Sequence, residues 1–414
     1  MPSFPAVMSG GPAAATFFES LADADAAALK LCKPSLITLP PVAPRQPPGA
    51  CRPLTLFGPG AVAAAVSDRN LADASGTALK RLIRIRLEFG LVVGMWYLYG
   101  KQNFIVMKMT FLDAATMGDV SFEPFHKFGE LTVYQTSTPE EALARVKDVE
   151  VLMINKVLVD KQLIDAAPNL KLICIAATGV NNIDVEYAAS KGIPVRNVAG
   201  YSTDSVAQTT FMHLLSLIGG GPYFDGSVKS GDYSRSGMFT DPKWNWWELA
   251  GKTIGIIGMG NIGRKVAQIA EAFGMKVCYF STSGTGHCKD YPCLELEQLL
   301  KVSDVVSIHA PLNERTKDLI GKNELSLMKP TAYLLNAGRG ASVVEADLAE
   351  AVDNGVIAGA GIDVFVQEPL PEDHSYLKMK HPERMRFSPH IAWASVEARE
   401  RLIGMMAENI AKGW

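Results

Sequence analysis

The chain has 414 residues, of which 48% are hydrophobic, and its formal net charge is −3. This length predicts about two or three domains, and the apolar fraction is large enough to build their cores. The charge leaves no basic excess of the kind that nucleic-acid binding needs, and no apolar run reaches the roughly 18 residues of a membrane helix. We therefore expect a globular protein whose partners include neither nucleic acid nor membrane.

The cysteines indicate a reducing compartment. None of the six forms a C-x-x-C pair, and a chain of this size does not depend on disulfides, so we expect a cytoplasmic protein. His287 and Cys288 with Cys293 have no fourth ligand at a matching spacing, so no metal is expected.

Residues 1–106 differ in kind from the rest, with Ala runs, Pro clusters and no sustained periodicity. A secretory signal fits poorly because no basic segment precedes an apolar core. An organelle transit peptide fits weakly, since acidic residues precede the first arginine, Arg45. We favour a third interpretation, in which translation starts at Met107 or Met109 and the atypical low-complexity extension is untranslated or disordered. A native peptide that begins upstream of Met107 would refute this hypothesis.

From Lys108 onward, apolar strand-like runs alternate with helical patterns. The expected helices include Pro139–Lys147, with Thr138 as its N-cap, and Val185–Lys191. Strands that alternate with helices predict a parallel sheet covered on both faces. The expected strands are Met109–Leu112, Leu131–Tyr134, Val149–Ile154, Leu170–Ala176 and Ile193–Val198.

A second series begins after a long apolar helix, Thr203–Leu217, which ends at a Gly-Gly-Gly-Pro break at 219–222. The last expected helix is Val396–Ala411. The fold class predicted from both series is α/β, with two doubly wound parallel-sheet domains. The strands expected in the second series are Thr253–Ile257, Lys276–Phe280, Val305–His309, Ala332–Asn336 and Gly359–Val364.

A G-x-G-x-x-G motif lies between the first strand of the second series and a helix expected at Arg264–Phe273. Gly258 permits a tight turn, Gly260 lets a pyrophosphate approach the backbone, and Gly263 permits close helix–strand packing. The helix N-terminus adds free N–H groups and partial positive charge. The motif therefore predicts a dinucleotide site. The expected contacts are Gly258, Gly260, Asn261, Ile262 and Gly263.

The choice between NAD and NADP stays open in the sequence, with NAD as the first expectation. An NAD site usually has Asp or Glu at the end of the next strand to bind the ribose hydroxyl, but Ser281 occupies that position. No carboxylate is there to repel a 2′-phosphate, and His287 and Lys289 are the basic residues that follow.

Three late motifs carry the clearest chemical signal: Asn336-Ala-Gly-Arg339-Gly after one strand, Gly361-Ile-Asp363-Val-Phe with Glu368-Pro after another, and Ser388-Pro-His390-Ile-Ala. In this order they resemble the D-isomer-specific 2-hydroxyacid dehydrogenase family, and most closely its glycerate dehydrogenase and hydroxypyruvate reductase branch. The resemblance runs from Met107 to near the C-terminus. It implies a homodimer in which a flavodoxin-like substrate domain (107–202 plus 392–414) and a Rossmann cofactor domain (203–391) flank a cleft.

Reduction of a 2-keto acid needs a hydride at the carbonyl carbon and a proton at its oxygen. Histidine suits the proton transfer, and we assign His390 as the acid and, in reverse, the base. A carboxylate on the far ring nitrogen fixes the tautomer and stabilises the imidazolium, and the resemblance assigns Glu368 to it. Arg339 can hold the substrate carboxylate with a fork that lysine lacks and can polarise the carbonyl.

The resemblance also implies contacts outside the catalytic trio. The backbone of Thr178, Gly179 and Val180 would hold the substrate carboxylate from the other domain, and Ala310 and Asp363 would lie along the cofactor. Hydroxypyruvate or glyoxylate is the expected substrate. Another 2-hydroxy acid is one alternative, and an NADH-sensing, corepressor-like binding protein with the same residues is the other.

Overall fold

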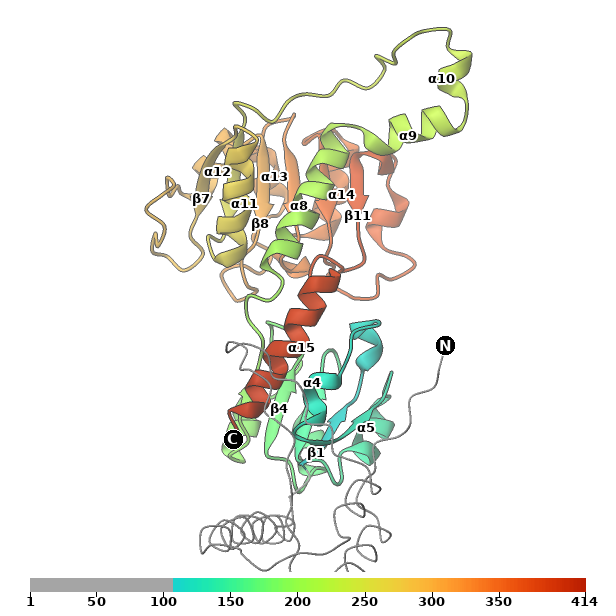
Figure 1. The fold of residues 1–414 in the computed structure, drawn as a ribbon. Coiled ribbons are helices and arrows are strands. Elements are labelled where there is room, and N and C mark those ends of the chain that lie inside the picture. The colour runs from blue at the N-terminus through green and yellow to red at the C-terminus, as the bar shows by residue number, and fades with distance from the viewer. Residues whose placement is uncertain (1–106) are drawn as a thin grey trace, which may run out of the picture. The chain divides into compact units, whose positions relative to one another are not determined.

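The computed structural model describes residues 107–414, which form two parallel α/β sheets with their helices (Figure 1). The predictions made for residues 1–106 lie outside the described residues. Both sheets are wholly parallel, which confirms the predicted fold class of two parallel α/β domains.

The first sheet has the strand order β2-β1-β3-β4-β5. This is the flavodoxin-like order 2-1-3-4-5. The direction in which strands are added to the sheet reverses between β1 and β3, which is therefore the switch point. Ligands of such sheets bind outside the carboxyl ends of the strands at that switch point. The strands are β1 (Met107–Phe111), β2 (Gly129–Val133), β3 (Val151–Ile154), β4 (Leu172–Ile175) and β5 (Val195–Arg196).

Helices cover both faces of this sheet, as its continuous apolar strands require. On one face η1 (Ala114–Met117), α4 (Glu123–His126) and α15 (Val396–Ala411) share a buried cluster with β1, β3 and β4. On the other face α5 (Pro139–Arg145), α6 (Lys161–Asp165) and α7 (Val185–Ser190) bury a second cluster. The C-terminal helix α15 thus completes the core of the sheet that begins the described chain.

The second sheet has the strand order β11-β10-β9-β8-β6-β7. Beyond β7, Tyr279 forms an isolated parallel bridge to Cys293, which adds a one-residue strand at that edge. Counted with this bridge, the order is the 3-2-1-4-5-6 of a Rossmann sheet with β11 as a seventh strand beside β10, and the switch point lies between β6 and β8. The strands are β6 (Thr253–Ile257), β7 (Lys276–Phe280), β8 (Val305–Ile308), β9 (Tyr333–Asn336), β10 (Gly359–Ile362) and β11 (Met385–Phe387).

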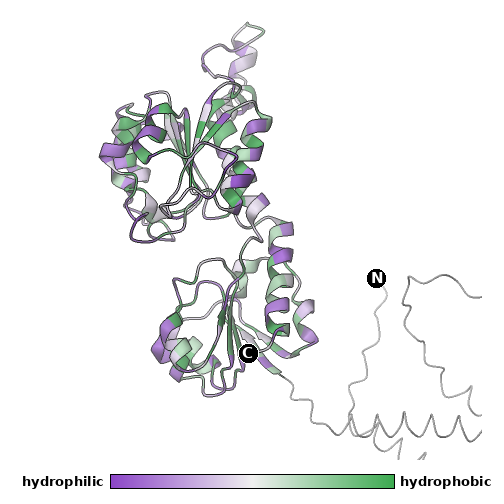
Figure 2. Ribbon diagram, turned by 90° about the vertical axis from the view of Figure 1, so that its left-hand side faces the viewer, coloured by the Kyte–Doolittle hydropathy of each residue, from purple (hydrophilic) through white to green (hydrophobic). Residues whose placement is uncertain are grey.

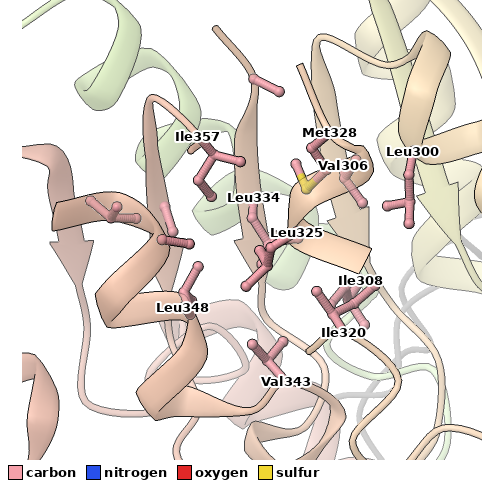
Figure 3. Packing of buried hydrophobic residues seen from close by; sticks show 14 of the residues in the cluster. Leu300, Val306, Ile308, Ile320, Leu325, Met328, Leu334, Val343, Leu348 and Ile357 are labelled. Atoms are coloured by element: carbon pink, nitrogen blue, oxygen red, sulfur yellow. The ribbon is translucent and has the colours of Figure 1, made fainter. Parts of the chain in front are cut away.

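Helices α8 (Thr203–Ile218) and α11 (Asn261–Ala272) cover one face of this sheet, and α12 (Leu296–Val302), α13 (Lys322–Leu327) and α14 (Glu345–Asp353) cover the other. Leucine side chains from α12, α13 and α14 pack against Val and Ile side chains of β8 and a leucine of β9 (Figure 3). The hydropathy colouring shows the same layering, with apolar strands inside and polar helix faces outside (Figure 2). Two short helices, α9 (Gly221–Lys229) and α10 (Asp232–Arg235), follow α8.

The expected strands are all present, but several are shorter than predicted. The expected strand Ile193–Val198 pairs only at Val195–Arg196, although Ile193 and Val198 remain buried beside it. Apolar residues that flank a strand pack into the core without a ladder partner, so hydropathy overestimates strand length. The predicted cap is confirmed: Thr138 accepts from the Glu141 N–H, and the Glu141 carboxylate accepts from the Thr138 N–H.

The break expected at 219–222 is also confirmed, since α8 ends at Ile218 and α9 begins at Gly221. Gly220 between them has a φ of 60°, a left-handed conformation that favours glycine. The sequence did not reveal the short elements α4, α6, α9, α10 and β11, which have five or fewer residues in most cases and carry little periodicity. Within residues 107–414 no helix has the length and apolar character needed to cross a membrane.

Candidate active site

A pocket with a cavity volume of about 530 Å³ collects residues from the carboxyl ends of both sheets. Its walls come from the loops after β3 and β4 in the first sheet and from those after β8, β9 and β10 in the second. This is where open parallel sheets place their ligands. Its predicted site residues are Thr178, Gly179, Ile262, Ala310, Arg339, Asp363, Glu368 and His390.

The glycine motif forms a cradle beside this pocket. Gly258 has a φ of 93°, and a Cβ there would lie 2.9 Å from the Ala310 Cα, so the loops after β6 and β8 touch. A Cβ on Gly263 would collide with the Gly258 carbonyl oxygen, whereas a Cβ on Gly260 would meet nothing within 4 Å. The motif is therefore tight where helix α11 meets the strand and open at the position where a pyrophosphate would approach.

Helix α11 begins at Asn261, directly after Gly260, and no side chain caps its first N–H groups. Of the residues predicted for the cofactor, Ile262, Ala310 and Asp363 line the pocket. Gly258, Gly260, Asn261, Gly263 and Ser281 lie outside its lining. This division fits a dinucleotide whose nicotinamide end would enter the pocket while its phosphates and adenosine lie along the cradle.

Ser281 lies just after β7, in a loop whose polar groups bond to one another. Its hydroxyl donates to the Thr285 carbonyl oxygen at 2.5 Å, and the His287 Nε2 lies 2.9 Å from the hydroxyls of Ser283 and Thr285. A Cβ on Gly284 would lie 3.3 Å from the Arg315 Nη1, so a guanidinium stands against this loop. Residues 281–289 contain no Asp or Glu. The Ser281 loop is thus hydroxyl-rich and basic.

The structure brings His390 and Glu368 together, with 2.6 Å between the histidine Nδ1 and the carboxylate Oε2. Their side chains are 25% and 30% exposed, so the pair stands at the pocket wall and stays within reach of solvent protons. A carboxylate accepts, so Nδ1 carries a proton and the ring presents Nε2 as its other functional nitrogen. This is the arrangement that orients an acid–base histidine.

The backbone of His390 is held in an unusual conformation. Its φ is 53°, and Asp318 is the other non-glycine residue with a positive φ among residues 107–414. A left-handed conformation costs a residue with a side chain about 1 kcal/mol or more. The His390 N–H donates to the Asp363 carbonyl oxygen at 2.7 Å, a bond that helps to hold this conformation. Backbone strain of this kind is often found at functional sites, where a side chain must be held in one orientation.

Glu368 is ionised through its contacts. Burial raises the pKa of its carboxyl, but the hydrogen bond from His390, the charge of that ring and the bond from the Phe365 N–H outweigh burial, so the pKa lies below its ordinary value. The carboxylate is therefore negatively charged at neutral pH, and its charge stabilises a protonated imidazole beside it.

Asp363 is fully buried at the end of β10. Its carboxylate accepts from the N–H groups of Ile391 and Ala392 at 2.9 and 3.0 Å and from the Ser388 hydroxyl at 2.5 Å. Burial raises the pKa of Asp363, and these hydrogen bonds act against the rise. The side chain predicted to lie along the cofactor thus anchors the loop that carries His390.

Arg339 follows β9 in a loop that Asn336 fixes from both sides. The Asn336 amide donates to the Arg339 carbonyl oxygen at 2.9 Å and accepts from the Gly338 N–H at 3.1 Å. A Cβ on Gly340 would collide with the backbone of Phe365, so the Arg339 loop packs directly on the loop that leads to Glu368. The guanidinium donates to the Gly338 carbonyl oxygen through Nη1 and lines the pocket.

The predicted substrate loop after β4 reaches the same guanidinium. A Cβ on Gly179 would lie 2.6 Å from the Arg339 Nη2, so a larger residue there would have to displace the guanidinium. The Thr178 hydroxyl donates to the Val198 carbonyl oxygen at 2.9 Å, which fixes the loop. Val180 packs against the core of the first sheet and lies outside the pocket lining, which leaves its backbone N–H as the group for the predicted contact.

The sequence analysis missed Asn155 and Lys156, which line the pocket directly after β3. The buried Asp113 carboxylate accepts from the N–H groups of Asn155, Lys156 and Val157 at 2.8, 2.5 and 3.0 Å. A lysine is thereby fixed at the switch point of the first sheet. Its position just after a predicted strand next to that switch point was the available signal.

The metal considered at His287 finds no support in the geometry, since that ring bonds to two hydroxyls. Among residues 107–414 no group of three or more His, Cys, Asp or Glu side chains could hold a metal ion. The chemistry available in the pocket is that of a paired histidine, a guanidinium and a dinucleotide cradle.

Fold and site together define a nicotinamide-dinucleotide-dependent oxidoreductase with a substrate domain and a Rossmann domain. The family described as D-isomer specific 2-hydroxyacid dehydrogenase, NAD binding domain, matches residues 211–392. A hydroxypyruvate reductase from Blautia hydrogenotrophica is 34% identical over 316 residues, 73% of this chain and 96% of the relative. The chain therefore belongs to the D-isomer-specific 2-hydroxyacid dehydrogenase family.

Two further proteins are similar over the same region. A glycerate dehydrogenase from Methylorubrum extorquens is 36% identical over 304 residues, 73% of this chain and 95% of the relative. The crystal structure of an NADPH-dependent glyoxylate/hydroxypyruvate reductase from Sinorhizobium meliloti matches with a TM-score of 0.64 and 27% identity, over 74% of this chain and 94% of that one. The predicted family and branch are thereby confirmed.

Proposed function

We propose that this dehydrogenase reduces hydroxypyruvate and glyoxylate to the corresponding 2-hydroxy acids. The observation that carries the proposal is the His390–Glu368 pair, which lines one pocket together with Arg339. The names of the relatives from Blautia hydrogenotrophica and Methylorubrum extorquens and of the Sinorhizobium meliloti structure support the substrate class.

Substrate binding and proton transfer are assigned to different residues of the pocket. Arg339, with the backbone of Thr178, Gly179 and Val180, binds the substrate carboxylate, and its guanidinium polarises the keto oxygen. His390 delivers the proton from Nε2 to that oxygen, and Glu368 stabilises the ring while it is charged. A nicotinamide cofactor bound along the cradle supplies the hydride.

The first test is steady-state oxidation of NADH, and separately NADPH, by hydroxypyruvate, glyoxylate, pyruvate and 2-ketoisocaproate. The proposal expects the highest kcat/KM with hydroxypyruvate or glyoxylate. A higher kcat/KM with pyruvate or 2-ketoisocaproate would contradict the proposed substrate but not the proposed reaction. Tight NADH binding without turnover of any keto acid would favour the NADH-sensing protein instead.

Glu368→Gln tests the role of the carboxylate. Reduction needs a protonated His390, so kcat falls as pH rises past the point where the ring loses its proton. Without the negative charge of Glu368 the protonated ring is less stable, and we expect the falling limb of the kcat profile to move to lower pH. The measurement is kcat for reduction across pH, with Glu383→Gln, beside the exposed His381, as the control. An unmoved limb would remove Glu368 from the mechanism.

We propose that the cofactor site accepts NADPH as well as NADH. The hydroxyl at Ser281, the adjacent Arg315 and the absence of acidic residues from 281–289 support this, because a 2′-phosphate meets positive charge and no carboxylate there. The Sinorhizobium meliloti relative is NADPH-dependent by its name, whereas the matching family is described by NAD binding.

Ser281→Asp should restore discrimination against NADPH. A carboxylate beside a 2′-phosphate is repelled, and we expect the Kd for NADPH to rise about tenfold or more while that for NADH changes by less than about threefold. Fluorescence titration of each reduced cofactor measures this without turnover. Ser326→Asp, an exposed serine on α13, is the matched control. An equal rise in the Kd for both cofactors would mean that the adenosine ribose does not bind beside Ser281.

We also propose a cytoplasmic homodimer with the domain boundaries given by the resemblance. Exposed apolar side chains on and after α9 support a second copy as partner, with Phe239 92% and Val228 and Trp246 60% exposed.

The four cysteines of residues 107–414 are free thiols, which supports a reducing compartment. Packing of α15 on the first sheet supports a substrate domain of 107–202 plus 392–414 beside the 203–391 cofactor domain. Sedimentation equilibrium tests the dimer, and cell fractionation tests the compartment.

A further inference from the structure

A buried polar chain runs from helix α8 to the loop of His390. The His213 Nε2 lies 2.9 Å from the Ser388 Oγ, and the Ser388 hydroxyl lies 2.5 Å from the Asp363 Oδ1. His213, Ser388 and Asp363 are 4%, 5% and 0% exposed, so water does not compete with these bonds. His213 is 175 residues from Ser388 in sequence.

The direction of these bonds follows from the proton count. The Ser388 hydroxyl has one proton, and a carboxylate can only accept, so that proton goes to Asp363. The Ser388 oxygen must then accept from His213, which places a proton on Nε2. Burial, with the positive charge of Arg386, lowers the pKa of His213 to about 4, so the ring is neutral. A single tautomer of a neutral histidine therefore fixes the orientation of the serine hydroxyl.

The fold makes room for this contact. Helix α8 packs on β10, where a Cβ on Gly361 would lie 2.7 Å from the Cβ of His213. Only glycine at this position of the strand lets the helix come close enough for the imidazole to reach Ser388. A leucine at position 213 would fill the same volume without the N–H donor.

We propose that His213 is a positioning residue for His390, acting through Ser388 and Asp363. His213 holds the Ser388 hydroxyl on Asp363, and Asp363 in turn holds the N–H groups of Ile391 and Ala392, next to the left-handed backbone of His390. This chain of hydrogen bonds fixes the orientation of the His390 side chain in the pocket. Its catalytic consequence rests on the proposed function, whereas its effect on the loop does not.

The first measurement is amide hydrogen exchange in a peptide that spans residues 388–394. His213→Leu should speed exchange of the Ile391 and Ala392 amides by about tenfold, because their acceptor is no longer held. His213→Gln keeps an N–H near the position of Nε2 and should restore most of the protection. His126→Leu, an exposed histidine on α4, is the control and should leave the peptide unchanged. Unchanged exchange in His213→Leu would overturn the proposal, whatever the enzyme's activity.

The second measurement is a double-mutant cycle on turnover. His213→Leu should lower kcat by about tenfold, with the Kd for NADH within about twofold of wild type, since the loop and not the cradle is affected. Ser388→Ala should have a similar effect, and the double variant should lose no more than either single one. Multiplied losses would mean that His213 acts by another route and would overturn the proposed coupling. If His213→Leu fails to fold, the comparison of His213→Gln with Ser388→Ala replaces it, and equal kcat in wild type and Ser388→Ala then overturns the proposal.

Discussion

Replacement of His390 by asparagine should lower kcat for keto-acid reduction by about a hundredfold to ten-thousandfold, the usual contribution of a positioned acid. Asparagine is the informative substitution because the backbone at this position has a φ of 53°, which asparagine adopts more readily than alanine. The side chain cannot deliver a proton to the keto oxygen at neutral pH. Steady-state kinetics with the preferred keto acid measure the loss.

Two comparisons separate the lost acid from a disturbed loop. The Kd for NADH of His390→Asn should stay within about twofold of wild type, because the cradle around Gly258 is formed by other loops. His390→Ala should lose the same activity and also some thermal stability, since alanine tolerates the left-handed backbone less well. His381→Ala, at an exposed histidine paired with Glu383, is the control. Near-normal turnover in His390→Asn would end the assignment of His390 as the acid.

The sequence could single out Arg339 and His390 because reduction of a keto acid needs a cation and a proton donor, whereas Glu368 was assigned by the family resemblance. Arg339 follows β9, Glu368 and His390 follow β10 and β11, and the carboxyl ends of parallel strands share one edge of the sheet. The glycine motif was equally readable, since its spacing and its place between strand and helix encode the turn. Contacts between residues at the strand ends therefore follow directly from the parallel arrangement of the strands.

What escaped prediction depends on contacts between distant segments. His213 lies in an apolar helix where no pattern separates it from a core residue, and its partner Ser388 is 175 positions away. Arg315 approaches the Ser281 loop only through the packing of two loops from different strands. Side-chain direction and cross-helix distance require the three-dimensional structure.

Arg339→Lys should lower kcat/KM for the keto acid by about a hundredfold, and Arg339→Met by about a thousandfold or more. Each charge-assisted hydrogen bond contributes about 1.5–3 kcal/mol, and lysine keeps the charge but loses the fork that binds a carboxylate through two parallel bonds. The guanidinium also lies against Gly179, where a Cβ would stand 2.6 Å from Nη2. The shorter lysine side chain would lose this contact.

The split between KM and kcat then tells what Arg339 does. Loss of carboxylate binding alone raises KM and leaves kcat unchanged, whereas loss of carbonyl polarisation lowers kcat as well, because that charge develops only in the transition state. The position of Arg339 between the Gly179 loop and the His390–Glu368 pair leads us to expect both effects. Added guanidinium should restore part of the activity of Arg339→Ala, and Arg145→Lys on α5 should behave as wild type. A normal KM in Arg339→Met would mean that another cation, with Lys156 the nearest candidate in the pocket lining, binds the substrate carboxylate.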